Sequence, residues 1–347
     1  MRLHRSAALA AALLAGAVVA ACGGDDDGTA TDSSTDSSTA STATATATAP
    51  APSTTDPSTP STTGAVTTVA PPVAVVGPAA RLDPDVAGDL DAEGVADRLS
   101  ASHATMVDPS ADGPTRAEAG VDHQLVLREL AGRPDLDDAV LAEVDPSARP
   151  AVERTVRARQ FLQERAAARP AQPLPDELPA WTIVEPEPVD TLLSHYAEAE
   201  QLTGIAWYWL AAIHLQETRM GRIQGVSSAG AVGPMQFLPT TWDVCCTGDP
   251  TVTRDSIIGA ATYLAQSGGP NDMAAAVYEY NPNDGYVAVV TAYAENLRDE
   301  PELYPGYHAF QVFVGTSAGT VRLPVGYSES APIDAASHLA DHPADAA

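Results

Sequence analysis

A glutamate at the end of an apolar run is the residue of this chain best suited to chemistry. Glu217 lies near the end of the stretch 205–219, which contains no glycine or proline and whose apolar residues recur at helical spacing. Counting back from it by helical turns gives Ile213, Leu210 and Ala206, so its carboxylate shares the face expected to pack inward. Burial raises a carboxyl pKa and keeps a proton available near neutral pH, as general acid catalysis requires. From this helix alone, a glutamate that only caps a loop or pairs with a nearby arginine is an equally good interpretation.

A loop of small residues and a later helix end add groups that can bind a sugar. The loop 224–233 is rich in glycine, alanine and serine, which lets a bulky substrate approach the backbone, and it leads into the segment 234–238 with Gln236. The stretch 273–280 predicts a helix that ends at Asn281, because the residue before a proline leaves helical space. A buried acid, an amide and aromatic rings are together typical of sites that cleave sugar polymers.

Four short motifs, in this order, resemble those of the catalytic domain of lytic murein transglycosylases, lysozyme-like enzymes that cleave peptidoglycan strands. Glu217-Thr218 matches the family's Glu-Ser/Thr motif. The segment 227–242 matches its Gly-x-Met-Gln motif, in the extended form typical of membrane-bound actinobacterial and B-type members. Tyr280-Asn281 and Tyr286-Val287 match the Ala-Tyr-Asn and terminal Tyr-Val motifs. The resemblance covers residues 190–300, about a third of the chain.

The resemblance implies a mainly α fold of the lysozyme-like, goose-type class and a non-hydrolytic reaction. In that reaction the bond between N-acetylmuramic acid and N-acetylglucosamine is cleaved and a 1,6-anhydro ring closes on the muramyl sugar. Glu217 would be the catalytic acid and then the base, no cofactor is expected, and the glycan strands of peptidoglycan are the expected partner. The residues expected to bind substrate are Thr218, Gly233, Met235, Gln236, Phe237, Tyr280, Asn281 and Tyr286.

Two departures from the family pattern leave alternatives open. Glu279 stands where the family usually has alanine, which allows a second carboxylate near the site. A hydrolytic muramidase would need such a carboxylate to activate water, and Glu279 and Asp243 are the candidates. A glycan-binding envelope lipoprotein without activity is the other alternative. The chain also has no acidic calcium loop of the kind some B-type members carry, because the segment 248–250 is too short, and no metal site is expected.

The N-terminal residues predict export. Residues 1–21 combine two arginines with a short apolar run, as in a secretory signal, and end in Val-Ala-Ala before Cys22. This resembles a lipoprotein signal in which Cys22 becomes lipidated and anchors the protein in the membrane, facing the cell wall. An ordinary signal, with Cys22 an incidental thiol, is the alternative. The stretch 22–77 is composed almost wholly of Asp, Ser, Thr, Ala and Pro, which predicts a disordered tether.

Charge and the remaining chemical side chains exclude several functions. The net charge is −28, and all 18 basic residues are arginines. This acidity argues against nucleic-acid binding, and the absence of lysine excludes a phosphate-binding P-loop lysine and a lysine Schiff base. Cys245 and Cys246 are adjacent and either close a vicinal disulfide or are partly buried small residues. His214 precedes Glu217 by three residues, and we expect a core histidine there.

The rest of the chain predicts a helical body with additions. The helices expected in the N-terminal region cover 92–106, 116–130 and 148–169. Two β-type runs at 308–314 and 320–325 predict a hairpin. The expected organisation is a helical region at 78–170, a Pro-rich linker or wrapping segment at 171–189, the catalytic region at 190–300, a hairpin region at 301–327 and a disordered acidic tail at 328–347.

Overall fold

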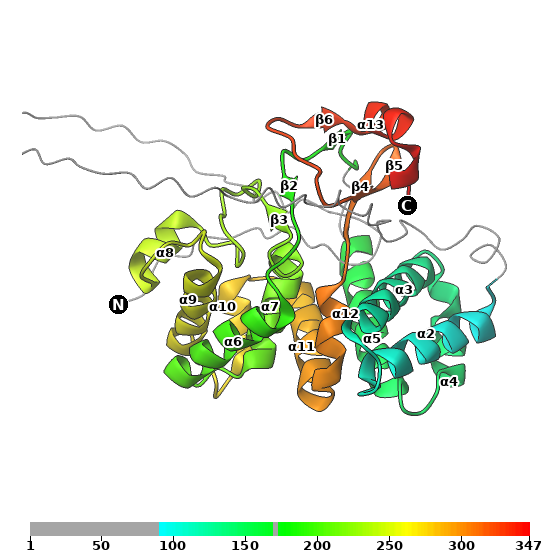
Figure 1. The fold of residues 1–347 in the computed structure, drawn as a ribbon, viewed down its shortest axis with the longest axis horizontal. Helices are drawn as coiled ribbons and strands as arrows, with labels where there is room; N and C mark the ends of the chain where they lie inside the picture. Colours follow the sequence, from blue (N-terminus) through cyan, green and yellow to red (C-terminus); the bar gives the residue numbers. More distant parts are fainter. Residues whose placement is uncertain (1–89, 169–172) are drawn as a thin grey trace, which may run out of the picture. The chain divides into compact units, whose positions relative to one another are not determined.

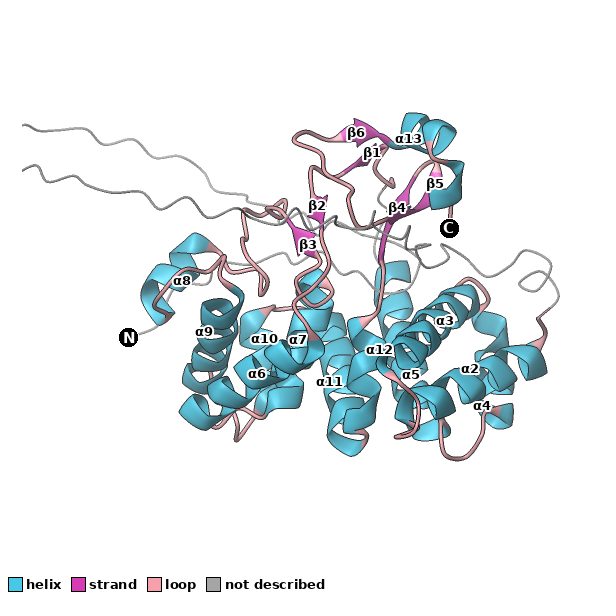
Figure 2. Cartoon of the chain, viewed as in Figure 1, coloured by secondary structure: helices cyan, strands magenta, loops and turns pink. Residues whose placement is uncertain are grey.

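A computed structural model describes residues 90–168 and 173–347 of the chain, and within them the protein is mainly helical (Figures 1 and 2). The signal at 1–21, the lipidation at Cys22 and the tether at 22–77 lie outside the described residues. Among the helices that are described, none is long and apolar enough to cross a membrane.

Over residues 90–168, the N-terminal region is built from four α-helices. Their bounds are α2 (Ala92–Val107), α3 (Gly113–Ala131), α4 (Asp137–Glu143) and α5 (Arg149–Ala167). Asp91 and Asp112 begin α2 and α3, where each side chain accepts a hydrogen bond from a backbone N–H three residues later. Three of these helices lie where the sequence predicts them. The fourth, α4, was not predicted because it spans only seven residues and begins with two aspartates.

The helices of the N-terminal region share a core with the rest of the described chain. Met106, Ala119 and Ala151 belong to the same buried cluster as the helices that follow residue 188. On α3, Gly120 lies so close to the backbone of Gly306 that an added Cβ would be 2.2 Å from the Gly306 carbonyl oxygen. Residues 90–168 are therefore an integral part of the fold rather than an appended module.

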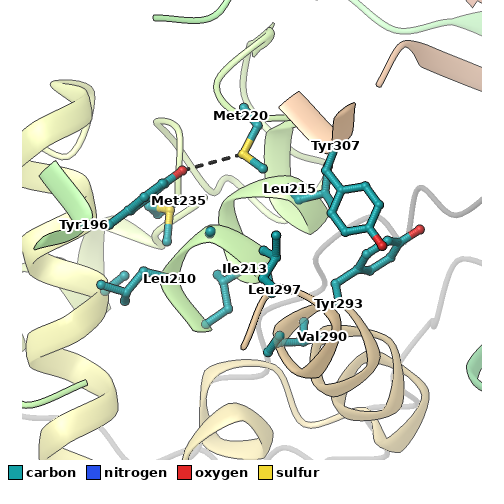
Figure 3. Packing of buried hydrophobic residues seen from close by; sticks show 14 of the residues in the cluster. Tyr196, Leu210, Ile213, Leu215, Met220, Met235, Val290, Tyr293, Leu297 and Tyr307 are labelled. Atoms are coloured by element: carbon teal, nitrogen blue, oxygen red, sulfur yellow. Dashed lines mark hydrogen bonds between the residues drawn. The ribbon is translucent and has the colours of Figure 1, made fainter. Parts of the chain in front are cut away.

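The predicted catalytic region holds six helices, of which one, α7, is central and buried. Their bounds are α6 (Val189–Thr203), α7 (Trp207–Thr218), α8 (Pro239–Cys245), α9 (Thr253–Gln266), α10 (Met273–Tyr280) and α11 (Asp284–Asp299). Every residue of α7 from Leu210 to Thr218 is buried. Leu210, Ile213 and Leu215 of α7 belong to one buried cluster with Val290 and Leu297 of α11 (Figure 3). The buried residues therefore surround the helix axis rather than forming a single inward-facing stripe.

Short strands follow and join the C-terminal residues to the middle of the chain. After α12 (Tyr304–His308), β4 (Val312–Thr316) and β5 (Gly319–Leu323) form the antiparallel hairpin that the sequence predicts. β2 (Thr182–Ile183) pairs with β3 (Ile223–Gln224), and β1 (Glu177–Leu178) pairs with β6 (Ile333–Asp334). The Pro-rich segment 171–189 therefore contributes two strands where it is described and acts as a wrapping segment rather than a free linker.

The expected disordered tail at 328–347 is a wrong prediction. These residues form β6, the helix α13 (Ala335–Asp341) and a final 3₁₀ turn. Ala335 is fully buried, and Asp345 forms ion pairs with Arg322 and His338. The acidic, polar composition suggested disorder, but a few apolar side chains and one buried carboxylate are enough to dock the segment on the hairpin.

Candidate active site

Glu217 lies in the last turn of α7 and is only 6% exposed. The hydroxyl of Tyr286 donates a hydrogen bond to its Oε1 over 2.5 Å. Burial raises the pKa of Glu217 to about 8, and the Tyr286 hydrogen bond acts in the opposite direction. The two arginines near it in sequence are bound elsewhere, Arg219 to the carbonyl of Leu215 and Arg222 to Glu185. Glu217 therefore holds a proton at neutral pH, as a general acid must.

Thr218 ties the end of α7 to the loop that follows it. Its hydroxyl donates to the carbonyl oxygen of Pro234 over 2.6 Å and accepts from the N–H of Gly221 over 3.0 Å. Thr218 is fully buried. In this structure it fixes the backbone around Glu217 and has no surface to offer a ligand.

The loop after α7 needs its glycine for space. Gly233 has a φ of +76°, and a Cβ there would lie 1.8 Å from the carbonyl oxygen of Pro250. Val232 and Phe237 exchange backbone hydrogen bonds, and between them Gln236 has a φ of +50°. The side-chain amide of Gln236 donates to the Gly233 carbonyl over 2.9 Å. One N–H of the Gln236 side chain is thus used within the loop. The oxygen of the side-chain amide is left available to another partner.

Aromatic rings hold this loop from the side of α9 and α10. The ring of Phe237 meets those of Trp242, Tyr263 and Tyr280 edge to face, at centroid distances of 5.1, 6.3 and 5.6 Å. The hydroxyl of Tyr280 donates to the carbonyl of Met235 over 2.5 Å, and Met235 is fully buried. Tyr280 also interacts electrostatically with Glu217, which adds to the effect of burial in raising the tyrosine pKa. The predicted residues at 217, 280 and 286 are thus brought together.

Two residues that position the site were missed from the sequence. Asn283 begins α11, and its side-chain oxygen accepts from the N–H groups of Gly285 and Tyr286. This cap fixes the helix end that carries Tyr286, and an asparagine before a helix is a recognisable signal for it. Ser256 was also missed; its hydroxyl accepts from the N–H of Met235 over 3.3 Å.

The two candidate second carboxylates lie apart from these contacts. Glu279 and Asp243 are both exposed. Within the described ranges neither forms a hydrogen bond or an ion pair with Glu217. Asn281 is 6% exposed and ends α10.

Cys245 and Cys246 form a disulfide at the end of α8, the first of the two interpretations left open by the sequence. In the part of the chain that the structure describes, no group of three or more His, Cys, Asp or Glu side chains could hold a metal ion.

Part of the chain is similar to a known transglycosylase. Over 80 residues it is 39% identical to the membrane-bound lytic murein transglycosylase F of Thiobacillus denitrificans. The similar stretch is 23% of this chain and 17% of that protein, so the chain spans less than a fifth of its relative. No protein-family profile and no solved structure matches the chain. The similarity supports a relation to lytic transglycosylases over that stretch.

Proposed function

We propose that the protein is a lytic transglycosylase with a lysozyme-like catalytic region, which cleaves the β-1,4 bond between N-acetylmuramic acid and N-acetylglucosamine in peptidoglycan. The observation that carries the proposal is the buried carboxyl group of Glu217. Its pKa is raised to about 8, and it accepts a hydrogen bond from the hydroxyl of Tyr286. The partial similarity to a lytic transglycosylase supports the same reaction.

One carboxyl group can perform both proton transfers of this reaction. Protonated Glu217 gives its proton to the glycosidic oxygen as the bond to the anomeric carbon breaks. The carboxylate that results is stabilised by the Tyr286 hydroxyl and then takes the proton of the muramyl 6-hydroxyl. That oxygen attacks the anomeric carbon and closes the 1,6-anhydro ring, so no water is consumed and Glu217 is protonated again.

The neighbouring residues would bind the sugar. We assign the free amide oxygen of Gln236 and the amide of Asn281 to hydroxyl or acetamido groups of the glycan. Thr218, Gly233, Met235, Phe237 and Tyr280 would shape the wall beside Glu217, mainly by fixing the loop 224–238 and the end of α7.

The alternatives have less support. An inverting muramidase needs a second carboxylate about 6.5–9.5 Å from the acid to activate water. Glu279 and Asp243, the two candidates, are exposed and make no contact with Glu217 among the described residues. A glycan-binding protein without activity would have no need of a buried acid, because burying a carboxyl group is unfavourable.

We also propose an envelope location. The signal at 1–21, lipidation at Cys22 and the tether at 22–77 would hold the enzyme on the membrane with the cell wall within reach. The similar protein is named as membrane-bound, which agrees with this proposal.

The substitution Glu217→Gln tests the assignment of the acid. Glutamine keeps the shape of the side chain but cannot donate a proton to the glycosidic oxygen, so product release from purified peptidoglycan should fall by at least about 10³-fold while binding to sacculi persists. Glu279→Gln and Asp243→Asn are matched controls and should retain activity. If Glu217→Gln still turns over, or if either control abolishes turnover, the assignment is wrong.

A further inference from the structure

A turn with left-handed backbone follows Glu217 almost directly. Arg219, Met220 and Gly221 have φ angles of +54°, +61° and +83°. A residue other than glycine is strained in this region and stays there only where its surroundings stabilise it. Two such residues in succession therefore need an external hold, and this turn sets the position at which α7 ends.

A buried hydroxyl group supplies that hold. The Oη of Tyr196, on α6, lies 2.8 Å from Nδ1 of His214 and 3.5 Å from Sδ of Met220 (Figure 3 shows the contact with Met220). The hydroxyl of Tyr304, from α12, donates to the same oxygen over 3.4 Å. Tyr196 and His214 are fully buried. Three helices and the turn thus meet at one oxygen atom.

The thioether of Met220 can only accept hydrogen bonds, and it lies within reach of two tyrosine hydroxyls. The Tyr196 hydroxyl is 3.5 Å from the sulfur and the Tyr304 hydroxyl is 4.0 Å from it. Between Tyr196 and His214 either group can supply the proton, depending on the tautomer of the ring. Nε2 of His214 has no hydrogen-bond partner among the described residues. Burial lowers the pKa of His214 to about 3, in agreement with a neutral ring.

We propose that Tyr196 and His214 are positioning residues for Glu217, which act by holding the left-handed turn behind it. The His214 carbonyl accepts from the N–H of Met220 over 3.2 Å, and the His214 ring binds the hydroxyl that contacts Met220 Sδ. His214 therefore contacts Met220 directly through its backbone carbonyl and indirectly through its side chain, by way of the Tyr196 hydroxyl. If the turn shifted, Glu217 would move relative to Tyr286. The role of these contacts in catalysis rests on the function proposed above.

The substitution Tyr196→Phe, made in the full chain, tests the hold without leaving a large cavity. We expect kcat to fall about 10–100-fold with KM changed less than about twofold, because a small misplacement of a catalytic group slows the chemical step. Without substrate, the pKa of Glu217 should fall toward its ordinary value as the carboxyl group gains access to water. Carbon-13 NMR of labelled glutamate carboxyls measures it, with Glu217→Gln to assign the signal.

Tyr307→Phe is the matched control. Tyr307 is 1% exposed, and its hydroxyl accepts a hydrogen bond from the side-chain amide of Asn296 over 3.1 Å. This substitution also removes a buried tyrosine hydroxyl, but one that makes no contact with the turn. The Glu217 pKa and kcat should stay at their wild-type values.

A pair of substitutions at His214 provides a second test if Tyr196→Phe does not fold. His214→Asn can keep a hydrogen-bonding atom, N–H or C=O, near the position of Nδ1, whereas His214→Leu cannot. We expect His214→Asn to retain the wild-type Glu217 pKa and His214→Leu to lower it. The positioning role is wrong if Tyr196→Phe and His214→Leu leave this pKa unchanged, or if Tyr307→Phe shifts it equally. If the pKa pattern holds but wild-type protein releases no anhydro products, the positioning stands and the proposed reaction fails.

Discussion

Burial of the Glu217 carboxyl links the proposed chemistry to the stability of the protein. Its pKa is about 8 in the folded protein and 4.5 in the unfolded chain, so between these values the folded state holds a proton that the unfolded state has lost. The bound proton of Glu217 contributes to the free energy of unfolding. This contribution is fully present below pH 4.5 and is lost as the pH rises through 8. The site therefore keeps its acid protonated at the expense of stability in mildly alkaline solution.

The variant Glu217→Gln should be more stable than the wild-type protein at high pH. Glutamine has no proton to lose, so the gain in unfolding free energy should be on the order of a few kcal/mol at pH 9 and nearly absent at pH 4. Urea denaturation at the two pH values measures it. A gain of equal size at both would mean that the effect does not come from the titration of Glu217.

The variant Tyr286→Phe should shift the alkaline limb of the activity profile upward. The Tyr286 hydroxyl favours the charged form of Glu217, so its loss raises the pKa of the acid further. We expect the decline of kcat/KM, near pH 8 in the wild type, to move to higher pH, with a lower plateau because the carboxylate intermediate loses its donor. Tyr327→Phe, which removes a hydroxyl bonded to Pro179, is the control. A limb that moves to lower pH would contradict the role assigned to Tyr286.

At this scale the sequence predicts the acid but not its supports. The helical spacing of apolar residues before Glu217 indicated an inward-facing carboxyl group, but that helix alone fitted a capping or ion-paired glutamate equally well. Tyr196 contacts His214 and Met220 across 18 and 24 residues of sequence and Tyr304 across 108, and no local pattern marks these contacts. His214 was expected in the core and lies there, but its link to the turn was not foreseen.

At the scale of elements, the contact between α3 and α12 joins the N-terminal helices to the rest of the fold. The close approach of Gly120 and Gly306 permits it, and the side chain of Gln124 exchanges two hydrogen bonds with the backbone of Gln311 over 3.0 and 2.7 Å. Helices can approach this closely only where both carry glycine or another small residue.

The variant Gly120→Ala should destabilise the whole folded unit. Its Cβ would meet the Gly306 backbone at 2.2–2.6 Å, which the helices can relieve only by moving apart, at a cost of about 1–3 kcal/mol. Gly132→Ala, at the C-terminal cap of the same helix, is the control, because the nearest neighbour of its Cβ would be 3.4 Å away. Thermal unfolding measures both. Equal melting temperatures for the two variants would show that the helices do not pack as described.

Helices were predicted better than the boundaries between regions. Apolar spacing indicates α2, α3 and α7 locally, and capping aspartates mark the starts of the first two. The short α4 and the docking of 328–347 depend instead on contacts with distant residues. The strands β1 and β6 have only two residues each, and their partners are more than 150 residues apart. Composition alone therefore suggested a linker at 171–189 and a disordered tail at 328–347, whereas strands from these two segments pair with each other.

At the scale of the whole molecule, the described residues 90–168 and 173–347 form one compact unit. Buried Asn296 of α11 shows why: its amide donates to the carbonyl of Ala151 and to the hydroxyls of Thr155 and Tyr307. Loss of α5 would leave this buried amide without two of its partners.

A fragment that begins at residue 173 should not fold cooperatively, whereas one that begins at residue 77 should. Without α2 to α5, the shared core and the Asn296 amide would be exposed, so the shorter fragment should lack a sharp thermal transition. Circular dichroism on both fragments tests this expectation. A cooperative transition in the shorter fragment would show that the predicted catalytic region is autonomous.

The most direct test of the proposed function is mass spectrometry of the products that the full chain releases from purified peptidoglycan sacculi. We predict muropeptides with 1,6-anhydro ends, lighter by the mass of one water than the corresponding reducing products, and none from Glu217→Gln. Reducing ends would contradict the proposal, because they would show that water and not the muramyl 6-hydroxyl attacks the anomeric carbon.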